Sequence, residues 1–316
     1  MNHNTHIYLA AKAIELTKQS VDNLHDGRRN YVYGKEKRRE RAAATHRQRL
    51  FQAHEHFIEE ASWVPDDVLR DNKPFHIFKL FTDDEFPEHG LTDRQQFTRD
   101  GVTYYKFSGG LAFRVDHLAR SIAAMWKLRD YNDQFSLKQI LYQYLLMSHY
   151  VVDAHVPLHC DLRDDRPSDY RSSDPTRELK GSKPSGRYLG KKAHSNLESL
   201  WNDAVTYVAV RENILGETWK KECVEPNELV NAVTFTFDDC KRGGEISVVK
   251  IPEHGLMDFM IDICITSKIH SRRLFPVENP IERNDDILEE ITREIFANCI
   301  GNLLSVWRYV WIHNLE

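Results

Sequence analysis

The segment from Ser136 to Val156 predicts a helix that is apolar on almost every side and yet carries a histidine and an aspartate, His149 and Asp153. A helix that is hydrophobic all round is buried inside a protein. An unpaired carboxylate in such surroundings costs several kcal/mol, so Asp153 needs a strong partner from elsewhere in the chain. Pro157 disfavours helix at the residue before it. We therefore expect the chain to turn there and to bring His159 toward the end of this helix from another direction.

The residue types around this turn favour a metal site. His149 and Asp153 are four residues apart and share one face of the helix, and the same spacing relates His194 to Glu198. Imidazole and carboxylate groups without thiolate form the ligand set of catalytic rather than structural zinc. The chain contains 16 histidines, which is a further compositional hint of metal. The alternative is a buried hydrogen bond between histidine and aspartate that only stabilises the core.

The composition excludes several other classes of protein. The formal net charge is -5 and 29% of the residues are charged, which indicates no general attraction to nucleic acid or to membranes. The five cysteines are scattered and never form a CxxC pair, so we expect neither a disulfide framework nor a thiolate zinc site. The chain shows no signal peptide at its start and no apolar stretch approaching about 18 residues. We expect a cytoplasmic protein without an integral membrane segment, and secretion stays open if the natural chain begins with a leader.

Helical periodicity predicts a mainly α protein with one multi-helical domain over residues 1–316. Residues 161–190 are rich in Asp, Ser, Pro and Gly and are expected to form a surface loop. Residues 214–252 are expected to be an insertion with a small β-hairpin from Val233 to Ile251 around CKRGG. The helices are expected at Thr5–Thr17 (with Thr5 as N-cap), Lys35–Ala61, Gly109–Arg129, Ser136–Val156, Ser195–Val210 and Asp285–Ile312.

The motif HYVVDAHVPLH, followed by HSNLE, resembles the signature of the zinc-dependent phospholipase C and single-strand-specific zinc nuclease superfamily. Members of that superfamily are helical and hold three zinc ions in one cleft to cleave phosphodiesters. The sequence keeps the distances within the motif, which are four residues from His149 to Asp153, six from Asp153 to His159, and four from His194 to Glu198. The resemblance covers the ordered motifs from His6 to Glu198 and, more loosely, the final aromatic helix.

The resemblance implies a set of ligands for up to three Zn2+ ions. The first ion would be held by Asp66, His76, His149 and Asp153, and the second by His159, His194 and Glu198. Asp66 lies in SWVPDD, so the adjacent Asp67 is an alternative ligand.

The third zinc ion would share Asp153 and add His6. In the superfamily this ion is commonly completed by the amine of an N-terminal tryptophan, whereas this chain begins with Met1. The resemblance therefore implies the Met1 amine as a ligand. His3 is an alternative, and a third possibility is that only two zinc ions bind tightly.

The resemblance implies a zinc-dependent phosphoric diester hydrolase, with Asp66 and Asp153 as catalytic carboxylates and Asp66 as the general base. His155 and Asp161 are candidates for orienting the ligands. Glu198 is typical of the phospholipase C branch, which favours a phospholipid or related phosphodiester as substrate. The alternatives are a single-strand nuclease or 3'-nucleotidase of the same superfamily, or a non-catalytic, metal-stabilised helical module.

One basic stretch bears on possible partners. Residues 28–49 contain nine Lys and Arg residues and include the run KEKRRER. Such a stretch is suited to transient contact with an anionic surface. The alternative is an ordinary solvated helix face, because Glu36 and Glu40 are interspersed with the basic residues.

Overall fold

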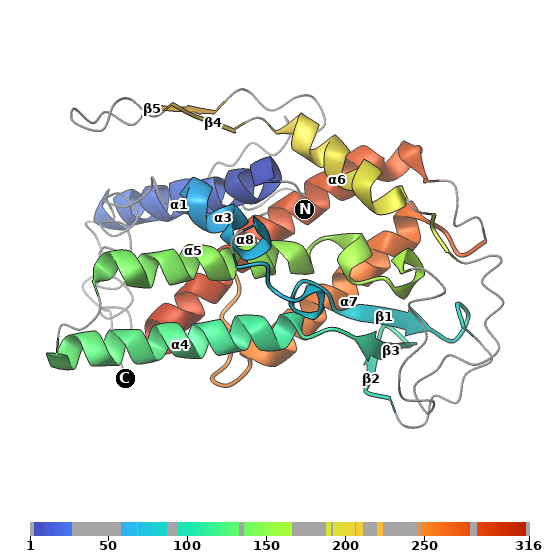
Figure 1. The fold of residues 1–316 in the computed structure, drawn as a ribbon, viewed down its shortest axis with the longest axis horizontal. Helices are drawn as coiled ribbons and strands as arrows, with labels where there is room; N and C mark the ends of the chain where they lie inside the picture. Colours follow the sequence, from blue (N-terminus) through green and yellow to red (C-terminus); the bar gives the residue numbers. More distant parts are fainter. Residues whose placement is uncertain are drawn as a thin grey trace.

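The structure is a computed structural model, and the described residues are mainly helical (Figure 1). It describes residues 3–26, 58–67, 69–86, 94–132, 136–165, 188–190, 192–205, 207–210, 220–223, 246, 248–278 and 283–313. The α-helices are α1 (His3–Asp26), α3 (Ile58–Asp67), α4 (Leu111–Asn132), α5 (Leu137–Ala154), α6 (Ala193–Ala204), α7 (Leu256–Leu274) and α8 (Leu288–His313). Short 3-10 turns are η2 (Lys73–Phe75), η3 (Pro157–His159), η4 (Leu162–Asp164) and η6 (Asp285–Ile287).

The β structure is small, as predicted, but the described strands all lie outside the predicted hairpin Val233–Ile251. Strands β1 (Lys79–Thr82), β2 (Gln96–Arg99) and β3 (Val102–Ser108) form an antiparallel sheet in the order β1-β3-β2. Strands β4 (Tyr207–Val210) and β5 (Lys220–Cys223) form a separate antiparallel pair. The mainly α fold with a small β component is therefore confirmed. In the part of the chain that the structure describes, the helices are all too short or too polar to cross a membrane.

Helix α5 lies at the centre of the fold and confirms the prediction for this segment. Its first turn is closed by a capping box, in which the Ser136 hydroxyl accepts a hydrogen bond from Gln139 N and the Gln139 side chain accepts one from Ser136 N. Every side chain from Tyr144 to Ala154 is buried. The helix packs against α1, α3, α4, α7 and α8, and in Figure 1 it lies between α1 and α4. Because this part of α5 is buried, the charge of Asp153 must be paired by side chains from the helices and turns around it.

Several helix boundaries differ from the prediction, most of all in α1, α3 and α6. Helix α1 begins at His3 and continues beyond the predicted end at Thr17 to Asp26. The assignment of Thr5 as N-cap is wrong, and Thr5 is buried within the helix instead. Helix α3 continues beyond the predicted end at Ala61 to Asp67. Helix α6 ends at Ala204, before the predicted end at Val210, and residues 207–210 form β4, because aromatic and β-branched residues such as those of YVAV favour strands.

Other predicted segments lie outside the described residues. They include most of Lys35–Ala61, the basic stretch 28–49 and most of the hairpin from Val233 to Ile251. Within that hairpin, residues 248–250 are described and run as irregular chain rather than as a strand. Strand β5 lies within the predicted insertion 214–252.

The predicted surface loop 161–190 begins inside the protein, which corrects the prediction for its first residues. Asp161, Leu162 and Arg163 are fully buried, and the chain forms the turn η4 there. Polar side chains stay in the core at this point because they are paired with charged groups from other elements. Composition alone could not reveal those partners.

A buried network of opposite charges explains this arrangement. Asp161 pairs with Arg163 Nη2 and Lys268 Nζ at 2.7 Å each, and it accepts a hydrogen bond from Ser271 Oγ at 2.6 Å. Glu85 Oε1 lies 2.7 Å from Lys268 Nζ and 3.2 Å from Arg163 Nε. Burial alone would raise the pKa of Asp161, but Arg163 and Lys268 hold this pKa well below its ordinary value. The network joins helix α7 to η4 and to the turn after β1.

Removing one member of this network should destabilise the fold strongly. We predict that Lys268→Met lowers the free energy of unfolding by about 3–5 kcal/mol, because it leaves the buried carboxylates of Glu85 and Asp161 with one cation fewer. The control is Arg273→Met on the same helix, where the ion pairs with Glu290 and Glu294 are partly exposed. That change should cost less than about 1 kcal/mol. Denaturant unfolding followed by circular dichroism measures both, and equal losses would contradict this account of α7.

Candidate metal centre

Eight of the predicted ligands come together from six separate parts of the fold. They form three groups in which the ligand atoms lie within 4.8 Å of one another. The side chains come from α1 (His6), α3 (Asp66), the residue after η2 (His76), α5 (His149 and Asp153), η3 (His159) and α6 (His194 and Glu198). The ninth predicted ligand, Met1, lies outside the described residues, as do the side chains of its alternative His3 and of Asp67.

The first group is formed by Asp66, His76 and His149, and Asp153 lies beside it, close to the Nδ1 atom of His76. This atom lies 2.8 Å from Asp153 Oδ2, 3.1 Å from His149 Nε2 and 3.6 Å from Asp66 Oδ1. His149 Nε2 lies 3.1 Å from Asp153 Oδ2 and 3.6 Å from Asp66 Oδ1. With zinc ligands at about 2.0–2.2 Å, the atoms of a tetrahedral site lie about 3.3–3.6 Å apart. A single proton on His76 Nδ1 cannot form hydrogen bonds to all three of these neighbouring atoms. A cation bound between Nδ1 and its three neighbours would interact with all four atoms.

The second group, formed by His159, His194 and Glu198, joins turn η3 to helix α6. His194 and Glu198 are one helical turn apart, and His194 Nε2 lies 2.8 Å from Glu198 Oε1. His159 Nε2 lies 3.5 Å from the same carboxylate oxygen. The other nitrogen of His159, Nδ1, lies 3.3 Å from Asp153 Oδ1. The prediction that the turn at Pro157 brings His159 back to the end of α5 is confirmed.

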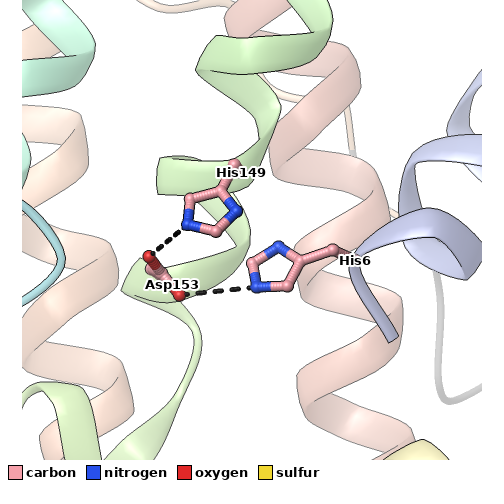
Figure 2. A group of neighbouring side chains, drawn as sticks. All are labelled: His6, His149 and Asp153. Carbon is pink, nitrogen blue, oxygen red and sulfur yellow. Dashed lines mark ion pairs between the residues drawn. The ribbon is translucent and has the colours of Figure 1, made fainter. Parts of the chain in front are cut away.

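The third group, formed by His6, His149 and Asp153, faces the N-terminal helix (Figure 2). His6 Nε2 lies 3.6 Å from Asp153 Oδ1, and the rings of His6 and His149 stack with their centroids 4.2 Å apart. Neither ring nitrogen of the buried His6 has a hydrogen-bond partner among the described residues. Buried polar groups without partners are rare in proteins. These orphaned nitrogens therefore fit the binding of a metal ion.

Asp153 connects all three groups. Its Oδ2 atom faces the first group, and its Oδ1 atom faces His6 and His159. The side chain is 1% exposed. Burial alone would raise its pKa, but the neighbouring imidazoles of His149 and His159 hold the pKa of Asp153 well below its ordinary value. The carboxylate is therefore charged in the folded protein and able to bridge cations.

The histidines differ in their protonation. Burial lowers the pKa of His6 and of His159, so both rings are neutral at pH 7, as metal binding requires. Burial also acts to lower the pKa of His194, but hydrogen bonds with Asp164 and Glu198 outweigh it and raise the pKa to about 9. Burial opposes ionisation of Glu198, yet hydrogen bonds with His159 and His194 lower its pKa. The second group is thus a protonated histidine beside a charged carboxylate when no metal is bound.

Asp164 contacts a predicted ligand, and the sequence did not single it out. Its Oδ2 atom accepts a hydrogen bond from His194 Nδ1 at 2.9 Å, which turns Nε2 toward Glu198. Carboxylates commonly orient metal-binding histidines in this way. The sequence offered His155 and Asp161 as candidates for this role, with a bystander role as an equal alternative for each. Asp161 belongs instead to the buried charge network described above.

His155 also has a different role from the one predicted. Its Nδ1 atom donates a hydrogen bond to Val151 O at 2.7 Å, and its Nε2 atom lies 2.9 Å from the Asn302 side-chain amide. The ring therefore ties the last turn of α5 to helix α8. Burial lowers the pKa of His155 to about 4, so the ring stays neutral at pH 7.

A second set of polar side chains fixes the segment between Asp66 and His76. Tyr150 and Arg114 both donate hydrogen bonds to Asp71 Oδ2, and the bond from Arg114 Nη2 measures 2.6 Å. The Tyr150 ring lies 5.2 Å from the His76 ring. Burial and the bond to Asp71 raise the pKa of Tyr150, so the hydroxyl remains a donor. These contacts anchor to α4 and α5 the segment that carries two ligands of the first group.

No family model, curated protein or solved structure matches this chain. The superfamily that the motif resembles therefore stays a prediction. The three residue groups could hold metal ions. Which metal they would bind, and for which reaction, has to be inferred from the donor atoms and from the motif.

Metal binding at the second group should release a proton. Because the pKa of His194 is about 9 in the metal-free fold, its ring is charged at pH 7 and must lose a proton to bind a cation. We predict that zinc binding releases about one proton from this group at pH 7, and that its affinity rises about tenfold per pH unit from about pH 6 to pH 8. Titration calorimetry in buffers of different ionisation enthalpy measures the release. Enthalpies that do not depend on the buffer would contradict the prediction.

Proposed function

We propose that this protein is a zinc-dependent phosphoric diester hydrolase, most simply a phospholipase C-like enzyme that acts on a phospholipid or a related phosphodiester. The observation that carries the proposal is the convergence of imidazole and carboxylate atoms from six elements around Asp153. The resemblance to the zinc-dependent phospholipase C and nuclease superfamily supplies the class of reaction. The spacing of the motif is part of that resemblance, and the geometry of the side chains adds separate support for a metal centre.

The donor atoms favour zinc over the common hard cations. Calcium and magnesium prefer sites made of oxygen atoms, whereas mixed imidazole and carboxylate sites suit zinc. The three carboxylates Asp66, Asp153 and Glu198 would offset half of the charge of three divalent ions. The remaining positive charge favours binding of a phosphate anion. When bound, zinc lowers the pKa of a water molecule toward neutrality and offsets the charge that develops on phosphate oxygens.

The two proposed catalytic carboxylates differ in exposure, and this difference separates their roles. The Asp66 side chain is 36% exposed, whereas that of Asp153 is 1% exposed. Asp66 is open to solvent and can accept a proton from an attacking water molecule as a general base. Asp153 is held by the buried helix α5 and keeps His6, His76 and His159 in place. We therefore assign proton transfer to Asp66 and the organisation of the ligands to Asp153.

Two other functions fit the same residues less well. A single-strand nuclease or 3'-nucleotidase of the same superfamily would use the same ligands, but that branch usually has aspartate at the position of Glu198. A metal-stabilised module without catalytic activity would be expected to close its sites with protein ligands, as structural zinc sites do. The exposure of Asp66 favours a site that is open to substrate.

The substrate class can be tested directly. We predict hydrolysis of phosphatidylcholine and of a chromogenic phosphodiester, loss of that activity on treatment with a chelator, and its recovery on addition of zinc. Product release is measured with the same protein against single-stranded DNA and RNA. Cleavage of nucleic acid alone would favour the nuclease alternative, and zinc binding without hydrolysis of any of these substrates would favour the non-catalytic module.

The role of Asp153 can be tested by comparing two substitutions, one at Asp153 and one at an aspartate that follows a surface histidine at the same spacing. We predict that Asp153→Asn reduces kcat/KM for the hydrolysed substrate by more than about 100-fold, because even residues that only orient ligands typically contribute about 10–100-fold. It should also lower the bound zinc measured by elemental analysis. The control is Asp258→Asn, since Asp258 follows the exposed His254 at the same spacing but belongs to none of the three groups. Similar activity in the two variants would contradict the assignment of Asp153.

A further inference from the structure

Strand β1 begins with a lysine that lies inside the protein. The Lys79 side chain is 1% exposed. Its ammonium group donates hydrogen bonds to Leu158 O at 2.6 Å, to Asp161 O at 3.1 Å and to Asp164 Oδ2 at 3.2 Å. A lysine ammonium has three protons, so these three acceptors use all of them. A buried ammonium with such complete pairing fixes the geometry of every group that it contacts.

Strand β1 and the residue before it also hold the backbone around His159. Phe78 N donates to His159 O at 3.1 Å, and Leu80 N donates to Cys160 O at 2.9 Å. Leu80 pairs with Asp161 as a parallel β-bridge. The bond from Lys79 to Leu158 O lies directly before His159 in the chain. Strand β1 therefore determines where His159 is placed.

Through its contact with Asp164, Lys79 also influences the position of a side chain on helix α6. Asp164 Oδ2 lies 3.2 Å from Lys79 Nζ and 2.9 Å from His194 Nδ1. The opposite nitrogen of His194 lies 2.8 Å from Glu198 Oε1. The orientation of the His194 ring thus depends on a carboxylate that Lys79 holds in place.

We propose that Lys79 is a positioning residue for the second metal group, acting through the peptide at Leu158 on His159 and through Asp164 on His194. The inference rests on the proposed zinc-dependent function. Lys79 itself does not contact the ligand atoms. Its charge is offset by Asp164 and by Asp165, whose Oδ1 atom lies 3.5 Å from Lys79 Nζ.

If Lys79 positions the second group, we expect its substitution to weaken zinc binding at that site alone. In full-length Lys79→Met, which keeps an unbranched side chain one atom shorter and removes the charge, the affinity of one zinc equivalent should fall by about 10–100-fold. The other equivalents should retain the affinity of the wild-type protein. Competition with a chromophoric chelator, combined with elemental analysis, measures the number and affinity of the bound ions.

Two further variants identify which site is affected. His194→Ala marks the zinc equivalent that belongs to the second group, and adding Lys79→Met to it should remove no further equivalent. Asp164→Ala breaks the same chain of contacts without changing Lys79, so it should weaken the same equivalent. It also tests the proposal if Lys79→Met does not fold.

A neighbouring lysine provides the matched control. Lys73 also pairs with Asp165, at 3.3 Å, but its side chain is 68% exposed. Lys73→Met should leave the number of bound zinc ions and their affinities unchanged.

The possible failures can be distinguished. Retention of every zinc equivalent at wild-type affinity in folded Lys79→Met would overturn the role of Lys79, whatever the result for Asp164→Ala. So would a parallel loss of all equivalents in these variants, since that result indicates a general effect on folding. A wild-type protein that binds no zinc would instead contradict the proposed function on which the inference rests.

Discussion

The interaction on which the rest of the structure depends is that between the buried charge of Asp153 and the imidazoles around it. Helix α5 is buried along its second half, so this carboxylate cannot be solvated by water. Ionised groups in such surroundings are stable only when they are paired or bind metal. The elements that pack around α5 supply His6, His76 and His159, and their positions follow from this requirement.

The protein contains two kinds of buried charged cluster, and their donors distinguish them. Asp161 is surrounded by Arg163, Lys268 and Ser271, which carry protons to donate at any physiological pH. Asp153 is surrounded by histidines, among which the neutral His6 makes no hydrogen bond through either ring nitrogen within the described residues. The first arrangement is complete without a ligand and stabilises the fold. The second could be completed by cations, and this difference is the physical reason for proposing a metal centre there.

The sequence predicted the parts of the structure that depend on local pattern. The apolar stretch around His149 predicted a buried helix, and the position of Pro157 predicted the return of the chain to its end. The spacing of His194 and Glu198 predicted one helix face. These features need only the geometry of a single helix or turn, which the order of residues determines.

Other features depend on partners that are distant in the sequence. Helix α7 was not predicted, because the polar residues Lys268 and Ser271 interrupt its apolar pattern and are buried only through the charge network. The choice between Asp161 and Asp164 as the partner of a ligand depends on the pairing of β1 with the chain after His159. Neither a periodic pattern nor a motif carries that information.

The most direct measurement of the central claim is anomalous X-ray diffraction from crystals of the zinc-loaded protein at the zinc absorption edge. The account predicts separate anomalous peaks among the atoms of the three groups, with Asp153 between two of the ions. A map without peaks at these positions, from crystals that contain the same side-chain arrangement, would contradict it.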